Sequence, residues 1–321
     1  MRTSMKSIAA ALSAAMFCLM SCVNLSTDDG NQNNGGNPKD DTPSSKDDDS
    51  KMDDSGDVYV LESADCEYVG KDGTRSSYRC FEKPVYITPE WSNVPVLQSY
   101  TLRDAYHYSG TRIVEYEYEY VYLYPSKVLF YESAGEEPSK FTFNSKGLIE
   151  SVLDDEGIGG LRFQYDSDGR LAKITYTYHD GSTVENYFYT FSYDSHSRLS
   201  EIEETTDAPD NYGSLVSFEY SSIPSKNSYP LQLVLPGFFF SELFEVYQGL
   251  VMSGLMGKSF SDCLLKSMKL TDYDEEFNAG EEYSYVLDAN GYVKEMQTRI
   301  WEDGNNGGLT TLSSSFEWKK L

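Results

Sequence analysis

The residues that could do chemistry are few and scattered. The chain has three histidines, His107, His179 and His196, and no two of them stand at the spacing of a zinc site. It contains no glycine-rich phosphate loop, GxSxG motif or HExxH motif. Asp166-Ser167-Asp168-Gly169 is a fragment of a calcium loop without the third acid and the distal glutamate, so a turn is expected there. The sequence predicts neither a metal nor a cofactor.

Paired carboxylates are the remaining catalytic possibility, because a glycosidase works with two of them. Glu117 with Glu119, and Asp154 with Asp155, are such pairs. The chain holds 52 acidic residues, so pairs arise by composition alone and carry little information. No catalytic residue is assigned, and whether the protein is an enzyme stays open, with a non-enzyme favoured.

Cysteines offer a second kind of chemistry. Cys66 and Cys80 flank the turn signal Asp72-Gly73-Thr74, and a three-residue loop there would pair residues whose numbers sum to 146. Cys66 and Cys80 satisfy that sum, so a cross-strand disulfide is expected in an oxidising compartment, with two half-buried thiols as the alternative. Cys263 has no evident partner and is expected in the core.

One sequence motif occurs four times, and it predicts the secondary structure in which several of these residues lie. Each copy has an aromatic-x-aromatic pair, a polar turn and alternating aliphatic residues, which indicates one β-hairpin. Because an isolated hairpin is unstable, successive copies should pair edge to edge. We therefore expect a mainly all-β fold, an antiparallel meander of hairpins forming a curved sheet or open barrel. The copies are FTFNSKGLIESVL (141–153), FQYDSDGRLAKITYTY (163–178), FSYDSHSRLSEIEE (191–204) and YSYVLDANGYVKEMQTRIW (283–301).

The stretch from Arg112 to Tyr124 alternates tyrosine with glutamate or aliphatic residues, so its tyrosines share one strand face. The segment YFYTFSY (187–193) follows the same pattern. Such a row either covers the core or forms an exposed platform that stacks on sugar rings or a partner protein. The candidate binding face is Tyr116, Tyr118, Tyr120, Tyr122 and Tyr124.

Residues 236–257 break the strand pattern, because their apolar residues follow helical spacing. One inserted helix is expected there, filling the core. A mobile lid over a ligand is the alternative.

The N-terminus predicts where the protein works. Residues 1–21 carry two basic residues and then an apolar run, which is typical of a signal peptide. Leu19-Met20-Ser21-Cys22 resembles a bacterial lipobox, which implies lipidation of Cys22. Residues 22–57 then form an acidic tether too poor in apolar residues to fold. Residues 58–321 are expected to be a single β-rich domain with the helical insert.

Charge limits the partners. The formal net charge is −26, which argues against nucleic acid and against adhesion to anionic phospholipid. Contact with a membrane is expected only through the lipid anchor. A glycan or a protein is the expected kind of ligand.

The repeated phrase resembles the Tyr-Asp repeats of Rhs-type and wall-associated proteins. The whole layout, from lipobox and acidic tether through YDSDGRLAKI and LDANGYVKEM to SSFEWKKL, resembles lipoproteins of Bacteroides-group bacteria that carry a β-rich domain of unknown function. In that group an acidic stretch behind the lipidated cysteine acts as a surface-export signal. The resemblance implies a fold and a location but no activity.

These patterns together predict an outer-membrane lipoprotein at the cell surface, with the periplasmic face as the alternative location. Its expected role is non-catalytic binding or scaffolding. Two alternatives stay open, a hydrolase acting on extracellular glycan or peptide and a carrier that holds an apolar ligand between sheet and helix.

Overall fold

A computed structural model describes residues 58–69, 73, 75–88, 95–108, 111–121, 129–130, 139–153, 160–180, 183–207, 213–226, 231–233, 261–273, 278–302 and 310–321. They form one antiparallel sheet of sixteen strands and one short 3₁₀ turn. The strands are β1 (Tyr59–Val69), β2 (Arg75–Ile87), β3 (Val96–Tyr108), β4 (Thr111–Val121), β5 (Leu129–Phe130), β6 (Ser139–Phe143), β7 (Ile149–Leu153), β8 (Gly160–Tyr165), β9 (Leu171–Asp180), β10 (Thr183–Tyr193), β11 (Leu199–Thr206), β12 (Gly213–Pro224), β13 (Cys263–Asp272), β14 (Asn278–Leu287), β15 (Val293–Glu302) and β16 (Thr310–Lys320), and the turn is η1 (Leu231–Leu233).

Every pair of sheet neighbours but one is consecutive in the chain. The order runs β4-β3-β2-β1-β16-β15 and then down to β5. The exception is β1 with β16, which joins the first described strand to the last. The edges β4 and β5 follow each other along the chain, and no backbone pairing joins them within the described residues. The predicted curved meander is confirmed, and the sheet stays open.

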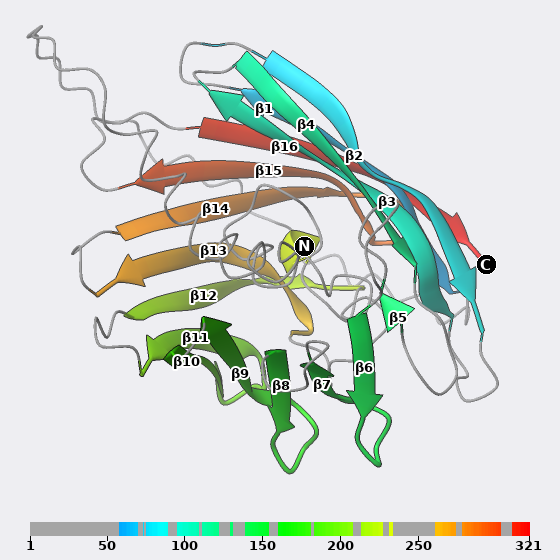
Figure 1. The fold of residues 1–321 in the computed structure, drawn as a ribbon. Helices are drawn as coiled ribbons and strands as arrows, with labels where there is room; N and C mark the ends of the chain where they lie inside the picture. The colour runs from blue at the N-terminus through cyan, green and yellow to red at the C-terminus, as the bar shows by residue number, and fades with distance from the viewer. Residues whose placement is uncertain are drawn as a thin grey trace, which may run out of the picture.

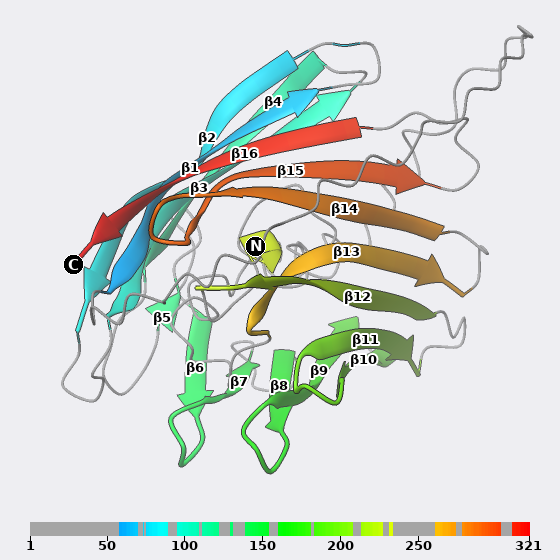
Figure 2. The same cartoon turned by 180° about the vertical axis from the view of Figure 1, so that it is seen from behind.

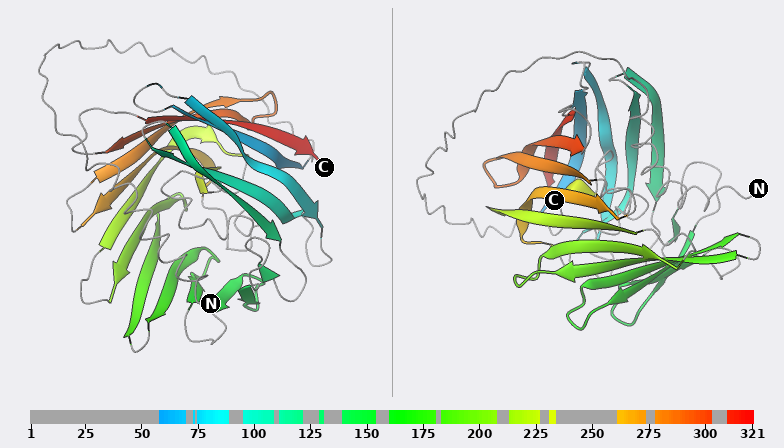
Figure 3. Two further views of the ribbon diagram at one scale, coloured as in Figure 1. Left: turned by 45° about the horizontal axis from the view of Figure 1, so that its top comes forward. Right: turned by 90° about the vertical axis from the view of Figure 1, so that its left-hand side faces the viewer.

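The sheet curves strongly, and its concave side holds the core (Figures 1 and 3). Where side chains are described, alternate residues of a strand point inward, as in β8, where Leu161 and Phe163 are buried and Arg162 is exposed. η1 lies within the curve in both Figure 1 and Figure 2. There Leu231 joins the core, and the Gln232 amide donates to the Tyr285 hydroxyl at 2.7 Å.

The four repeated turns share one hydrogen-bond design. In the second copy, the Asp166 N–H donates to the Arg170 carbonyl at 2.9 Å, and the Asp166 carboxylate accepts the Arg170 N–H at 2.8 Å. Asp194 and Asp288 make the same side-chain bond in their turns, and Asn144 does so in the first copy. The polar residue at the head of each turn therefore fixes a three-residue loop.

The last loop position of each turn has a positive φ. Glycine takes it in three copies, at Gly147 (77°), Gly169 (81°) and Gly291 (83°), whereas the third copy has Ser197 at 63°. Glycine adopts this conformation without the steric penalty that a Cβ brings. The turn at His196-Ser197 is therefore the weaker version, because Ser197 carries a Cβ in this conformation.

The aromatic-x-aromatic pair has a divided task. Its first ring enters the core: Phe163, Phe191 and Tyr283 are all buried. In the second to fourth copies, and in two similar pairs at 218–220 and 316–318, the second ring donates a hydrogen bond to a backbone carbonyl on the preceding strand, and we call this contact an aromatic clasp. Phe143, the second ring of the first copy, has no donor. The clasps are Tyr165 to Ile149, Tyr193 to Leu171, Tyr220 to Leu199 and Tyr285 to Leu265 at 2.7–2.8 Å, and the indole N–H of Trp318 to Val293 at 2.7 Å.

Each clasp lies at the point where a backbone ladder ends. Between β9 and β10, for example, the last paired residues are Lys173 and Thr190. The clasp then joins Leu171, two residues before Lys173, to Tyr193, three residues after Thr190. The same offsets hold at all five sites. The clasp thus satisfies a carbonyl that strand pairing no longer reaches.

Two further expectations have different outcomes. The aromatic row of β10 covers the core, since Tyr189 and Phe191 are buried in it, which is the first of the two outcomes expected for residues 187–193. The expected helix at 236–257 lies outside the described residues. The described part contains no helix long and apolar enough to cross a membrane.

The turn geometry predicts opposite effects for two substitutions. Gly169→Ala should lower the free energy of unfolding by about 1 kcal/mol, because alanine resists a positive φ. No atom lies within 4 Å of the added Cβ, so the loss comes from the backbone alone. Ser197→Gly should raise stability by about 0.5 kcal/mol. Urea denaturation measures both, and equal signs for the two variants would contradict the assignment.

Candidate binding site

β2 changes its partner halfway along its length. It pairs with β1 only from Arg75 to Phe81, and with β3 only from Phe81 to Ile87. Within the part of the chain that the structure describes, the matching part of β1, residues 59–63, therefore pairs with β16 alone. Beyond Phe81 the two strands diverge, and the sheet opens between them.

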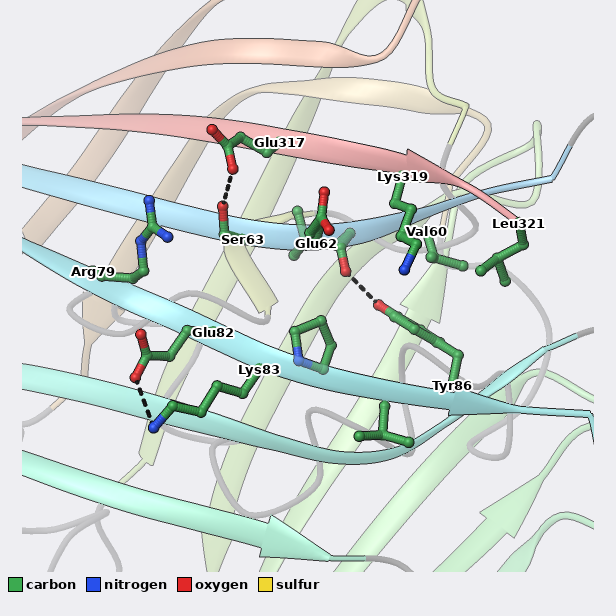
Figure 4. Close-up of a pocket in the computed structure, with 13 residues that line it drawn as sticks. Val60, Glu62, Ser63, Arg79, Glu82, Lys83, Tyr86, Glu317, Lys319 and Leu321 are labelled. Atoms are coloured by element: carbon green, nitrogen blue, oxygen red, sulfur yellow. Dashed lines mark hydrogen bonds and ion pairs between the residues drawn. The ribbon is translucent and has the colours of Figure 1, made fainter.

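A groove of about 590 Å³ fills this opening, which is within the usual range for ligand pockets. Figure 4 shows it between β1 and β2, with side chains of β16 along the far side. The lining residues are Val60, Leu61, Glu62, Ser63, Arg79, Glu82, Lys83, Pro84, Val85, Tyr86, Glu317, Lys319 and Leu321. They include neither histidine nor cysteine.

Irregular backbone creates the divergence. The β2–β3 register shifts between Glu82 and Val85, and Lys83 within this bulge has a φ of 55°. Pro84 has no N–H to give to a ladder. Together these residues prevent β2 from continuing alongside β1.

A sixth aromatic clasp crosses the groove. The Tyr86 hydroxyl donates to the Leu61 carbonyl at 2.8 Å, as Figure 4 shows. Here the last ladder pair is Ala64 with Phe81, so Tyr86 stands five residues beyond the ladder rather than three. The groove is thus a widened version of the strand ends at the five other clasps.

The charged side chains around the groove are held in pairs. Arg79 donates to both carboxylate oxygens of Asp65, at 2.9 and 3.1 Å, and this hydrogen bond raises the pKa of Arg79. The Ser63 hydroxyl donates to Glu317 at 2.8 Å. These contacts fix the positions of the polar groups around the closed end of the groove.

Glu82 anchors the other wall. Its Oε1 lies 2.9 Å from Arg103 and 3.3 Å from Lys83, and both contacts are ion pairs without hydrogen-bond geometry. Because the Glu82 side chain is only 16% exposed, the paired cations offset the desolvation of its charge. The arrangement holds these charges in fixed positions beside the groove.

The two cysteines meet close to the groove, although the register differs from the expected one. The structure pairs Val69 with Arg75 and Cys66 with Tyr78, so the sum of 146 is wrong. A bulge near Asp65 inserts an extra residue into β2 and turns Cys80 toward the core. The two buried sulfurs consequently lie 2.8 Å apart as thiols.

Cys263 is not in the core as expected. It is half-buried at the start of β13, beside a second cavity of about 280 Å³ formed by three segments at the turn rim. The cations of this cavity are already engaged, because Arg170 pairs with Asp166, and Arg198 with Asp194. This makes the cavity a weaker candidate site. Its lining residues are Asp168, Arg170, His196, Ser197, Arg198, Ser261 and Asp262.

None of the other predicted site residues is among the described residues that line the groove. Tyr116, Tyr118 and Tyr120 lie in β4, where Tyr120 pairs in register with Tyr100 of β3, but their side chains are outside the described residues. Outside them too lie Tyr122, Tyr124, Cys22 and the pair Asp154 and Asp155. No group of three or more His, Cys, Asp or Glu residues in the described part is placed to hold a metal ion.

Sequence reasoning missed the groove, although one signal was present. Lys83-Pro84 interrupts a segment that otherwise reads as a strand, and a proline within a strand marks an edge or a bulge. The divergence of β1 from β2 follows from that dipeptide. The lining residues of β16 come from the other end of the chain, so no local pattern could have added them.

A polar row crosses the concave face away from the groove. Register places Tyr189, Glu204, Ser214 and Asp272 side by side on four neighbouring strands. Tyr189 and Ser214 donate to the two Glu204 oxygens at 3.1 and 3.2 Å. Burial raises the pKa of Glu204, and these two hydrogen bonds oppose but do not cancel that shift.

Comparisons with known proteins show the fold alone. No protein-family model matches the chain, and no curated protein matches its sequence. The chain is similar to the crystal structure of a porin-like protein from Bacteroides uniformis, with a TM-score of 0.53 and 16% identity, over 81% of this chain and 96% of that one. A porin-like protein from Bacteroides vulgatus matches with a TM-score of 0.44 and 13% identity, over 74% and 98%.

The cysteine geometry predicts a disulfide between Cys66 and Cys80 when the protein folds in an oxidising compartment. Alkylation after denaturation should then label Cys263 and spare these two. Reduction should lower the free energy of unfolding by about 3 kcal/mol, the value for a loop of about 15 residues. The variant Cys263→Ser serves as the control and should keep that sensitivity. Labelling of Cys66 and Cys80 in the oxidised protein would disprove the bond.

The raised pKa of Glu204 predicts a pH-dependent stability. Glu204 favours the folded state only while protonated, so its contribution falls as pH rises through its folded pKa. Glu204→Gln removes this titration, and its stability relative to the native protein should therefore increase from pH 4 to pH 7. Urea denaturation across that range measures the difference, and a constant difference would contradict the prediction.

Asp166→Asn is the matched control, because the pKa of Asp166 is shifted in the opposite direction to that of Glu204. Burial alone would raise the pKa of Asp166, but hydrogen bonds from Arg170 outweigh it and lower the pKa. Ionised Asp166 therefore stabilises the fold above its unfolded pKa. The variant should be less stable than the native protein at pH 7, and the gap should close as pH falls below about 4.

Proposed function

We propose that the protein is a lipid-anchored binding or scaffold module of the outer membrane, displayed at the cell surface, and that the groove between β1 and β2 is its binding site. The observation that carries the proposal is the groove itself. It is an opening of ligand size whose charged groups are held in place by ion pairs. Because these polar side chains are already held in place, less conformational entropy is lost when a ligand binds.

The charged outer face of the sheet favours membrane attachment through a lipid over contact of this face with the hydrocarbon. Exposed ion pairs lie on it, such as Lys266 with Glu219 at 3.1 Å and Arg299 with Glu282 at 3.5 Å. A strand surface that faces hydrocarbon needs apolar side chains, because each charge there is costly. We infer that this face meets water and that Cys22 supplies the membrane contact.

The balance of charge in the groove favours binding over catalysis. Its six charged lining residues divide equally into Glu62, Glu82 and Glu317 against Arg79, Lys83 and Lys319. The groove is therefore locally neutral on a chain whose net charge is −26. The lining therefore neither repels an anionic ligand strongly nor requires a cationic one. Among the described lining residues, Ser63 is the only hydroxyl besides Tyr86; it is bonded to Glu317, and no histidine of that lining stands beside it to act as a base.

The hydrolase alternative has one observation in its favour. The raised pKa of Glu204 suits a general acid, and Asp272 stands two strands away on the same face. In that case Glu204→Gln would abolish hydrolysis of an extracellular glycan or peptide. The binding proposal expects the same variant to leave ligand binding at the groove unchanged.

A ligand screen tests the binding proposal directly. The full chain, purified in mild detergent, would be applied to a glycan array and to a peptide display library. Bound ligand should protect Val85 and Lys83 from hydrogen exchange or labelling, because both line the groove. Ligands that bind without protecting these residues would place the site elsewhere.

The anchor predicts the behaviour of Cys22→Ala. This variant should leave the detergent phase and partition into water, because an acyl chain is the only membrane contact proposed. Phase partitioning of the native protein and the variant measures the effect. Cys263→Ala is the matched control and should partition like the native protein. If Cys22→Ala stays with the membrane, another part of the chain binds lipid.

A further inference from the structure

We propose that the groove takes an extended peptide segment of another protein, which adds as a strand to the free edge of β1. This inference rests on the proposed function and names its ligand class. It starts from the backbone of residues 59–63, which pair with β16 on one side and, among the described residues, with no strand on the other. An edge of this kind offers main-chain hydrogen bonds to a strand from outside.

The Tyr86–Leu61 contact shows the direction of that edge. The Leu61 carbonyl points into the groove, since the Tyr86 hydroxyl reaches it at 2.8 Å from the opposite wall. A hydroxyl donor here takes the place that a strand N–H would occupy. A peptide N–H can replace it at small cost, because one neutral hydrogen bond exchanges for another.

The two walls of the groove differ in their ability to pair with an added strand. β2 carries Lys83 and Pro84 at the opening, which are devices that natural sheets use to block edge pairing. β1 carries Tyr59, Val60 and Leu61, residues of good or neutral strand propensity with no proline among them. The peptide should therefore pair with β1 alone, antiparallel to it, over about five residues.

The charges of the groove fit a main chain better than a strongly charged ligand. The lining is neutral as a whole, and its ion pairs already satisfy Arg79 and Glu82. Amide groups carry dipoles without net charge, so a main chain needs no counter-charge from the groove. Val60 and Val85 supply apolar surface for alternate side chains of the peptide.

The experiment uses a display library of random heptapeptides and the full chain in mild detergent. Selected peptides are resynthesised with N-methyl groups on alternate amides, in the two possible parities. Because only one parity faces β1, methylation of that parity should weaken binding at least tenfold, and methylation of the other should change it little. Similar losses in both parities, or none, would overturn strand addition while leaving the groove as a binding site.

Tyr86→Phe supplies the second arm. It frees the Leu61 carbonyl, so the selected peptides should bind about fivefold tighter, the equivalent of one net hydrogen bond. Tyr193→Phe removes the same kind of clasp, from Leu171, far from the groove. It should cost similar stability and leave peptide affinity unchanged. Equal affinity changes in both variants would contradict the inference.

The outcomes separate this inference from the function on which it rests. If glycans and no heptapeptides protect the groove, the peptide assignment fails and the binding module stands. If no probe of either class protects Lys83 and Val85, both fail.

Discussion

The aromatic clasp is the contact on which the rest of this sheet depends. A hairpin with a three-residue turn leaves the first carbonyl of its returning strand without a ladder partner, and a buried carbonyl in that position costs free energy. Tyrosine or tryptophan from the next strand supplies the donor at every such point, as Tyr193 does for Leu171. The same ring covers the core with its apolar face. One side chain therefore joins neighbouring hairpins and seals their divergent ends.

The groove follows from the same rule when the offset grows. At β1 and β2 the bulge of Lys83-Pro84 pushes the clasping ring two residues farther from the ladder. Tyr86 still reaches Leu61, but the space beneath it is now large enough for a ligand. The proposed binding site is thus a local change to a repeated structural unit, made by one dipeptide.

How much of this could be read from the sequence depends on how local each cause is. The hairpins follow from turn residues such as Asp166 and Gly169, whose effects act within five positions, so their existence and class were predictable. The register of Cys66 was not, because the bulge near Asp65 is set by packing between strands. The second aromatic of each pair was visible as a pattern, but its partner carbonyl became evident only with the fold. The groove joins residues 60–63 to Glu317, and no local pattern links positions so far apart.

The pairing of β1 with β16 has a consequence for how the chain reaches this structure. Ser63 and Glu317 are 254 positions apart, while most other strand pairs are joined by short connections. The hairpins from β6 to β12 and from β13 to β15 can form early, because their short loops close at little entropic cost. β1 has to wait until β16 has emerged, and until then its far edge is as bare as the edge facing the groove. The last step of assembly is therefore itself the addition of a strand to β1.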